Sequence, residues 1–270
     1  MQPLTLELPQ LKAVAVRDDG EPFFTGSQVL HTIEKNGFKE QDPEEWYSAF
    51  CTLSHALTGK IPAQEISALI FSGQMQDVIP IGSDRRALGN AILYSDGRAG
   101  AQAEAIENAV GSDTITAITG NHFDGSMPLA KILWLKENQP EIYEKAAAFL
   151  ISSKDYVVAR LTGNFIGDMT ACATAGAMDL EHKTWSEHLI NDAGLDINKF
   201  PKLLHSHELA GVIAEKGAAD TGYLPEQKST QAPEMPGLPL FQWYLSPWRI
   251  QCKPGYFQLG GSCIKRPYGQ

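Results

Sequence analysis

Two polar loops, each directly after an apolar run, carry the side chains best suited to bind a small hydroxylated molecule. The first is Ser72–Asp77 (Ser-Gly-Gln-Met-Gln-Asp), which follows the apolar run Ile66–Phe71. Loops at strand ends commonly hold ligands in α/β sheets, and Gly73 lets the backbone approach a ligand closely. The amides of Gln74 and Gln76 can both donate and accept hydrogen bonds, which suits a polyhydroxylated ligand. The alternative is an ordinary polar loop.

The second loop is Asp96-Gly97-Arg98, which follows the predicted strand Ala91–Tyr94. The Asp96 carboxylate can accept hydrogen bonds from hydroxyls, and the Arg98 guanidinium can donate to oxygens. The alternative is an Asp–Arg turn that merely starts the next helix at Ala99.

A third stretch, Ser126–Asn138, is less informative in physical terms. It predicts a helix that begins near Pro128 and presents an apolar face together with Trp134. Such a pattern by itself indicates packing, so Trp134 is interpreted as a structural residue.

The elements that must position these residues alternate between strands and helices. Turn signals around short apolar runs predict strands, over Leu11–Arg17, Pro22–Phe24, Gln28–Ile33, Ile66–Phe71, Val78–Ile81 and Ala91–Tyr94. The clearest helix begins at Asp42, since Asp42 can cap the free amides and Pro43 suits the first turn. Its buried face is given by Trp46, Phe50, Leu53 and Leu57.

Helices dominate the later part of the chain. They are predicted over Ala99–Val110, Pro128–Glu137, Pro140–Leu150, Ser153–Leu161 and Lys183–Ala193. Ser153 and Thr184 are the expected caps of the last two. This order of elements indicates a mixed α/β layered domain rather than a doubly wound sheet.

The character of the sequence changes at about Glu226. Gln227–Gln270 contains six prolines and has neither a helical period nor strand alternation. We therefore expect residues 227–270 to form a divergent and poorly ordered tail.

Composition excludes several classes of protein. With 270 residues, 43% hydrophobic and 20% charged, the chain is typical of a folded globular protein. A net charge of −10 disfavours nucleic acid and anionic membranes as partners. The start, Met1–Gln10, lacks the features of a secretory signal, and four scattered cysteines predict reduced thiols in a cytoplasmic protein. A disulfide between Cys252 and Cys263 is the alternative.

Five sequence pieces together resemble the FGGY family of carbohydrate kinases, in the order in which that family carries them. The stretch 126–138 fits the first signature of the family, with Pro128, Lys131 and Trp134 at the signature spacing. The other four pieces are Gln41–Trp46, Ser72–Met75, the segment Lys154–Asp168 with its Leu-Thr-Gly, and the run Asp179, Trp185, Pro201 and Gly211 before Thr221-Gly222. The resemblance spans about Lys12–Leu224 and is closest to xylulokinases.

The resemblance implies both a fold and an activity. The fold is α/β, an actin-like ATPase (ribonuclease-H-like) N-terminal domain with a mixed sheet and added helices. The activity is transfer of the ATP γ-phosphoryl group to a sugar hydroxyl, with Mg²⁺ and a carboxylate base. The residues it places at the substrate are Gln74, Met75, Gln76, Asp96 and Arg98, and Lys12 lies on the ATP side.

Three departures from the family pattern bear on activity. The family opens with an Asp-x-Gly-Thr-Thr phosphate loop before the lysine matching Lys12, and Met1–Leu11 contains no such loop. Xylulokinases carry His where this chain has Gln76. The Gly-rich strand that holds the catalytic Asp is absent after Thr221–Pro225. No catalytic residue is therefore assigned.

These observations predict a sugar-binding domain over residues 1–226, with an atypical start at 1–11. By family the chain is a pentulose (xylulose-like) kinase, but we expect it to be catalytically incomplete on its own and not to bind ATP and Mg²⁺ productively. Two alternatives are a non-catalytic sugar-binding module and a defective fragment. Expected partners are a sugar and either a missing kinase half or a second copy, since the face that meets an ATP domain should expose apolar area.

Overall fold

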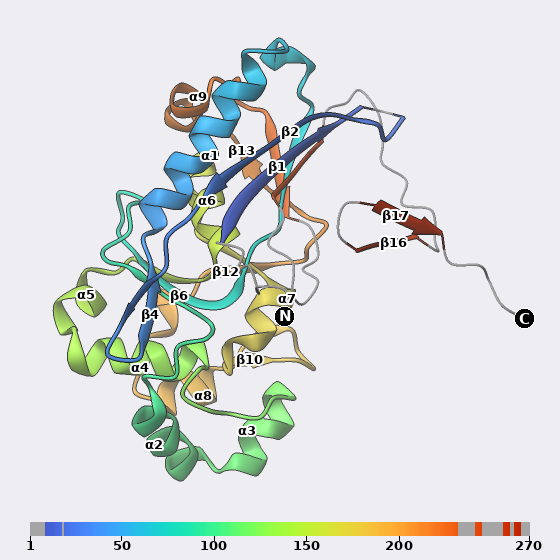
Figure 1. Cartoon of the computed structure of the whole chain (residues 1–270). Helices are drawn as coiled ribbons and strands as arrows, with labels where there is room; N and C mark the ends of the chain where they lie inside the picture. The colour runs from blue at the N-terminus through green and yellow to red at the C-terminus, as the bar shows by residue number, and fades with distance from the viewer. Residues whose placement is uncertain (1–8, 18, 232–240, 245–255, 260–261, 266–270) are drawn as a thin grey trace, which may run out of the picture.

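The computed structural model describes residues 9–17, 19–231, 241–244, 256–259 and 262–265. Two sheets are surrounded by helices, with the larger sheet beside α1, α6 and α9 and most of the remaining helices at the opposite end (Figure 1). Within the described residues, none of the helices combines the length and the apolar character that crossing a membrane requires.

The larger sheet has six strands. Their spatial order is β13 (Leu209–Val212), β14 (Lys228–Gln231), β5 (Ala68–Phe71), β15 (Phe241–Tyr244), β1 (Gln10–Val16) and β2 (Pro22–Val29). The hairpin β1–β2 is antiparallel, β14 runs parallel to β5, and β15 lies parallel to β1 and antiparallel to β5. The sheet is therefore mixed, as the sequence predicts.

Two strands of this sheet fall in the segment expected to be a poorly ordered tail. Residues 228–231 pair with β13 and β5, and residues 241–244 lie between β5 and β1. The expectation of a poorly ordered tail over residues 227–270 as a whole stays a prediction. A further hairpin, β16 (Tyr256–Leu259) and β17 (Ser262–Lys265), forms in the same part of the chain. Cys252 lies outside the described residues, so its predicted thiol state stays a prediction.

The second sheet has five strands and is antiparallel throughout. Their order is β3 (Ile33–Lys35), β4 (Phe38–Gln41), β7 (Ala91–Ile92), β6 (Met75–Ile81) and β8 (Ala148–Ser152). The chain passes from the first sheet to the second between β5 and β6, so the loop that begins at Ser72 joins the two sheets.

Nine helices and three short 3₁₀ turns complete the described residues. The helices are α1 (Pro43–Thr58), α2 (Gly100–Val110), α3 (Ser112–Thr119), α4 (Pro128–Asn138), α5 (Pro140–Lys145), α6 (Ser153–Thr162), α7 (Met169–Cys172), α8 (Glu187–Asp192) and α9 (Glu215–Thr221). The 3₁₀ turns are Ala63–Glu65, Ala173–Ala175 and Ile197–Lys199. Two short strand pairs are β9 (Ile166–Asp168) with β12 (Lys202–Leu204) and β10 (Met178–Asp179) with β11 (Thr184–Trp185).

The start of α1 confirms its sequence prediction. The Asp42 carboxylate accepts a hydrogen bond of 2.9 Å from the Glu44 backbone amide, and Pro43 occupies the first turn. Trp46, Phe50 and the predicted leucines of the same face are buried. An acidic cap therefore fixes where this helix begins.

One predicted helix is half wrong. The helix expected over Pro140–Leu150 ends at Lys145, and Ala148–Ser152 is the strand β8, buried at every position. Alternate residues of β8 face two different hydrophobic cores, with Leu150 in the first and Phe149 in the second. A strand buried on both faces has no polar alternation, which is why its sequence resembles that of a buried helix.

The helix predicted over Lys183–Ala193 begins later than expected. Thr184 and Trp185 form the strand β11, and the N-cap of α8 is Ser186, which accepts from the Leu189 amide at 3.3 Å. Ser153 likewise lies inside α6 rather than at its N-cap, which is Ser152.

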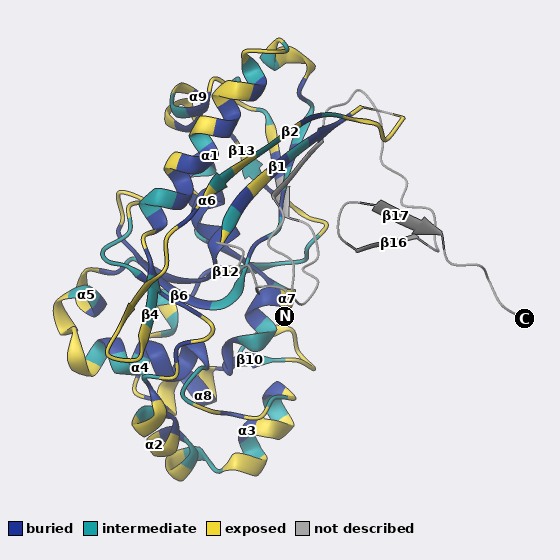
Figure 2. Cartoon of the chain, in the orientation of Figure 1, coloured by how far each residue is buried: buried dark blue, intermediate teal, exposed yellow. Residues whose placement is uncertain are grey.

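Two hydrophobic cores lie on either side of β6 and β8, and buried residues fill both the upper and the lower half of the molecule (Figure 2). The first core joins α1, α6 and the six-stranded sheet, and the second joins α2, α4 and α8. Ile79 of β6 belongs to the first core and Val78 to the second. The strand β6, which begins in the first polar loop, is thus held from both faces.

Candidate functional site

The backbone at Gln76 departs from a regular strand. On β6 and β8, Met75 pairs with Ser152 and Ile79 with Leu150, so β6 has two more residues than its partner over this interval. Gln76 lies in the resulting bulge with φ of 67°. Bulges re-aim side chains, and a left-handed backbone at a residue other than Gly is uncommon, so the surroundings must hold it.

Gly73 anchors the first half of the loop because a side chain does not fit there. A Cβ at this position would lie 2.5 Å from Ser153 Oγ and 2.9 Å from the Lys154 backbone nitrogen. The neighbouring Gln74 carbonyl accepts from the Ser153 amide at 3.1 Å and from Ser152 Oγ at 2.7 Å. The loop is thereby fixed to the start of α6.

The Gln74 amide is oriented by a second glutamine. Its Nε2 donates to Gln41 Oε1 at 3.1 Å, and the same oxygen accepts from Trp46 Nε1 at 3.0 Å. Gln41 and Trp46 belong to the sequence piece Gln41–Trp46, so two of the pieces that carry the family resemblance meet here.

The Gln76 side chain is half-buried and held loosely. Its Nε2 lies 3.5 Å from Ser126 Oγ, which is a long contact, and 3.4 Å from Met127 Sδ, which is a weak acceptor. Ser126 is itself fixed, because its amide and hydroxyl both donate to Asp124 Oδ1, at 2.7 and 2.6 Å. The Gln76 amide can therefore form stronger hydrogen bonds with another partner.

Lys131 of α4 forms hydrogen bonds to the backbone at this turn. It is fully buried, and its Nζ donates to the backbone carbonyls of Gln76 at 3.1 Å and Leu93 at 2.7 Å. Burial lowers the pKa of Lys131 to about 8, although the nearby charges of Asp77 and Asp96 act to raise it. The sequence interpretation, which assigned this stretch to packing alone, missed this residue. A lysine within an otherwise apolar helical face was the available signal.

The second predicted loop uses its charges internally. Asp96 is fully buried and accepts from the Lys39 amide at 2.6 Å and from Arg98 Nη2 at 2.7 Å. The Arg98 guanidinium also pairs with Glu40 at 2.8 Å, and its side chain is 1% exposed. These contacts are those of the structural alternative, a turn closed by its own ion pair, and a role in substrate binding stays a prediction.

Aromatic rings complete the burial of Arg98. Its Cζ lies 3.9 Å from the Phe38 ring centroid and 4.9 Å from that of Trp134. Burial by itself raises the pKa of Asp96, but the hydrogen bonds from Arg98 and Lys39 outweigh it, so the pKa is lowered overall. The carboxylate therefore stays charged well into the acidic range.

The two loops lie side by side because β6 and β7 are neighbours. Val78 pairs with Ile92, and Asp77 Oδ1 accepts from the Tyr94 amide at 2.9 Å. The Tyr94 ring is 52% exposed next to this contact. The five predicted substrate residues thus come from the ends of adjoining strands, and their role at a substrate stays a prediction.

Lys12, the predicted ATP-side residue, lies elsewhere. It is exposed on β1, opposite Ser27, in the six-stranded sheet. Among the described residues no group of three or more His, Cys, Asp or Glu side chains is arranged to hold a metal ion. The predicted role of Lys12 on the ATP side stays a prediction.

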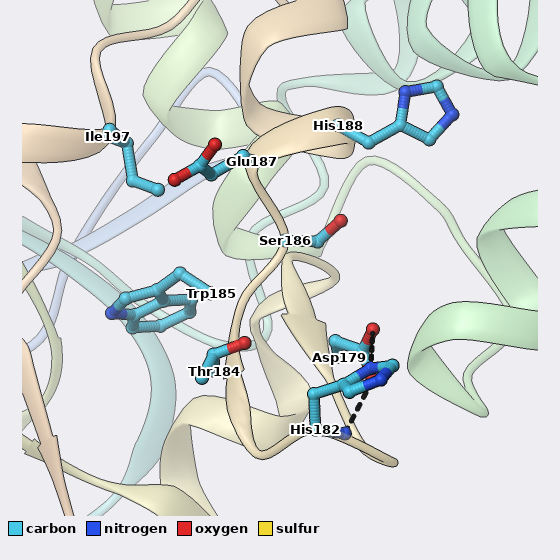
Figure 3. Close-up of a pocket in the computed structure, with 8 residues that line it drawn as sticks. All are labelled: Asp179, His182, Thr184, Trp185, Ser186, Glu187, His188 and Ile197. Carbon is cyan, nitrogen blue, oxygen red and sulfur yellow. Dashed lines mark hydrogen bonds and ion pairs between the residues drawn. The ribbon is translucent and has the colours of Figure 1, made fainter.

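A separate pocket opens between β10–β11, the start of α8 and Ile197 (Figure 3). Asp179 and His182 pair at its rim at 2.9 Å, and both are exposed to solvent or partly so. Trp185 Nε1 already donates to the Pro201 carbonyl at 2.7 Å. None of the predicted site residues lines this pocket, so it is not the site that the motifs indicate.

Comparison with known proteins decides the family. The family model described as FGGY family of carbohydrate kinases, N-terminal domain, matches residues 10–227. This chain belongs to that family. The loop Ser72–Asp77 and the helix α4 both lie inside the matched segment, whereas β15 lies outside it.

Similar proteins include xylulose kinases and gluconate kinases. The xylulose kinase of Bacillus subtilis is 32% identical over 221 residues, which cover 81% of this chain and 44% of that protein. The gluconokinase of the same organism is 28% identical, with 69% and 36% covered. This FGGY chain therefore spans less than half the length of these relatives.

Solved structures give the same picture of the fold. The ligand-bound xylulose kinase of Lactobacillus acidophilus superposes with a TM-score of 0.72 at 25% identity, over 83% of this chain and 48% of that one. The gluconate kinase from the same organism also gives 0.72 at 25% identity, with 84% and 48% covered. The predicted fold, the N-terminal domain of an actin-like kinase, is confirmed.

Proposed function

We propose that this FGGY chain binds a pentulose such as D-xylulose through the loop Ser72–Asp77. The observation that carries the proposal is the bulge at Gln76, whose side-chain amide is loosely held, two residues after Gln74, whose amide is anchored to Gln41. Two amides offer donors and acceptors together, as a row of sugar hydroxyls requires. The similarity to xylulose kinases favours a pentulose as the ligand.

Phosphoryl transfer needs more than this loop. Catalysis of that reaction is almost entirely positioning and charge stabilisation, around a base that accepts the proton of the attacking hydroxyl. We assign neither the phosphate cradle nor the base to a described residue. ATP-dependent phosphorylation of the sugar therefore requires a second lobe facing this one, and in its absence the chain is a sugar-binding module.

Calorimetry with the purified chain tests the proposal directly. D-xylulose should give saturable heat, whereas xylitol, which lacks the carbonyl group, serves as the matched control. D-gluconate is the competing candidate, because gluconate kinases are also among the similar proteins. Heat with D-gluconate alone would replace the pentulose by a sugar acid, and no heat with any of the three would contradict the proposal.

A coupled assay for sugar-dependent ADP release addresses the second part. We expect no turnover above background from the chain alone. Turnover that depends on D-xylulose would contradict the proposed requirement for a second lobe. Light scattering of the same sample tests the expected self-association.

A further inference from the structure

Burial of the charged Lys131 side chain is energetically unfavourable, so packing alone does not explain a lysine at this position. Its side chain is fully buried on α4, between neighbours such as Ala130 and Ile132 that are buried too. Removing an ammonium group from water costs several kcal/mol unless other groups replace the water. An apolar side chain of similar volume would avoid that cost, so the ammonium itself has a task.

That task is visible in what the ammonium contacts. The ammonium donates hydrogen bonds to the carbonyls of Gln76 and Leu93, which lie near the ends of the neighbouring strands β6 and β7. Gln76 sits where the ladder between β6 and β8 is interrupted, so regular strand pairing does not fix its carbonyl. Lys131 supplies a bond at the point where the sheet does not.

The conformation of Gln76 makes this bond consequential. A left-handed backbone is unfavourable for a residue other than Gly, and it persists only where the surroundings enforce it. The contacts of the Gln76 side chain to Ser126 and Met127 are too weak to enforce it. The direction of the Gln76 amide therefore depends on the backbone that Lys131 holds.

We propose that Lys131 is a positioning residue, whose buried ammonium ties the Gln76 turn to the end of β7 and keeps the Gln76 amide aimed at the sugar. The inference rests on the proposed sugar-binding function of this loop. Lys131 touches no sugar in this scheme and acts through Gln76. Four charged groups surround the ammonium, namely Asp77, Asp96, Arg98 and Asp124.

The state of the ammonium makes the inference testable through pH. Burial lowers the pKa of Lys131 to about 8, so its proton is lost just above neutral pH. A neutral amine still donates, but hydrogen bonds from charged donors are roughly twice as strong. Above pH 8 the Gln76 turn should therefore loosen, and D-xylulose affinity should fall by about fivefold between pH 7 and pH 9.

Stability should move in the opposite direction, which separates positioning from a purely structural role. The folded pKa of Lys131 lies below its unfolded value, so the unfolded chain binds more protons above pH 8. The contribution of Lys131 to the free energy of unfolding therefore rises with pH there, while sugar binding weakens. A lysine that only supported the fold would not weaken binding under conditions in which the fold gains stability.

The experiment compares Lys131→Met with Lys136→Met by calorimetry with D-xylulose at pH 7 and pH 9. Lys136 is the matched control, since it lies on the same helix and donates to the carbonyl of Gly194, away from the sugar loop. Lys131→Met should weaken binding at least tenfold at pH 7 and lose the pH dependence. Lys136→Met should bind as the unchanged chain does.

Two further readouts keep the inference falsifiable. If Lys131→Met does not fold, the D-xylulose affinity of the unchanged chain can still be measured as a function of pH. A constant affinity from pH 7 to pH 9 would overturn the inference. The backbone amide of Asp77, whose nitrogen follows the Gln76 carbonyl, should titrate near pH 8 in NMR spectra without any sugar. A titrating amide without sugar heat means that the proposed function fails, whereas sugar heat unaffected by Lys131→Met means that the positioning role fails.

Discussion

The loops Ser72–Asp77 and Asp96–Arg98 lie beside each other, and in the sequence each is a polar segment after an apolar run. They nevertheless use their polar groups differently. In the second loop Asp96 and Arg98 pair with each other, and Glu40 and the Lys39 amide complete the set. In the first loop the Gln76 amide makes only weak contacts. Opposite charges close in the sequence satisfy each other, whereas a neutral amide in a bulge keeps capacity for a ligand.

The difference has a physical cause in burial. A buried charge needs a full set of partners, so Asp96 and Arg98 are stable there only because each completes the other. A half-buried amide without a bound ligand costs little free energy, since water can form hydrogen bonds with it in the free state. The second loop therefore uses its charges within the fold, and the first loop is the one that keeps hydrogen-bonding capacity for the proposed ligand.

Removing the carboxylate of the second loop should have the largest effect. Asp96→Ala leaves the buried Arg98 with Glu40 alone and removes the acceptor of the Lys39 amide. We expect the free energy of unfolding to fall by about 3–5 kcal/mol in urea titrations. Asp84→Ala is the control, because Asp84 caps an exposed turn in the same way, through the Arg86 amide. A folded Asp96→Ala chain that loses only sugar binding would reverse the comparison.

The ion pair between Asp96 and Arg98 should make the free energy of unfolding depend on pH in the acidic range. The pKa of Asp96 is lowered in the folded chain, so its contribution is fully present above the unfolded value of about 3.9 and is lost as the pH falls through the folded pKa. The stability difference between the unchanged chain and Asp96→Asn should therefore shrink below about pH 4. Urea titrations from pH 6 to pH 3 measure it. A difference that stays constant over this range would show that folding does not shift the pKa of Asp96.

Truncating the amide of the first loop should affect binding and leave the fold intact. Gln76→Ala removes contacts that are weak in the free chain, so stability should change by less than about 0.5 kcal/mol. D-xylulose affinity should fall about tenfold, the effect of one lost hydrogen bond of roughly 1.4 kcal/mol. Gln102→Ala, on the distant helix α2, provides the control for calorimetry. Equal affinities for both variants would remove Gln76 from the site.

Much of the frame around these loops could be predicted from the sequence, because local signals specify it. Asp42 with Pro43 marks the start of α1, and the apolar run before Ser72 marks a buried strand; both are present. The strand β8 was mistaken for helix because both of its faces are buried. The strand β15 has no alternating pattern to reveal it, and its partners β5 and β1 are far away in the sequence.

The residue types of the site could be predicted from the sequence, but the hydrogen bonds and ion pairs between these residues could not. Gln74, Gln76, Asp96 and Arg98 were named as candidates, and the family resemblance placed them near one another. That Asp96 and Arg98 serve each other depends on β4, whose Lys39 and Glu40 complete the cluster from about 57 residues away. The left-handed backbone at Gln76 arises from the register between β6 and β8, which a single sequence does not encode locally.

Backbone strain provides the smallest test of the comparison. Gln76→Gly should raise the free energy of unfolding by about 0.5 kcal/mol, since Gly adopts a positive φ without the roughly 1–2 kcal/mol penalty but loses more entropy on folding. Gln28→Gly is the matched control: Gln28 lies in the regular strand β2 opposite Leu11, where Gly should cost about 1 kcal/mol. Urea titrations of both variants resolve the opposite signs. If Gln76→Gly destabilises as much as Gln28→Gly does, the turn at Gln76 is not strained, and Lys131 has no strained backbone to hold.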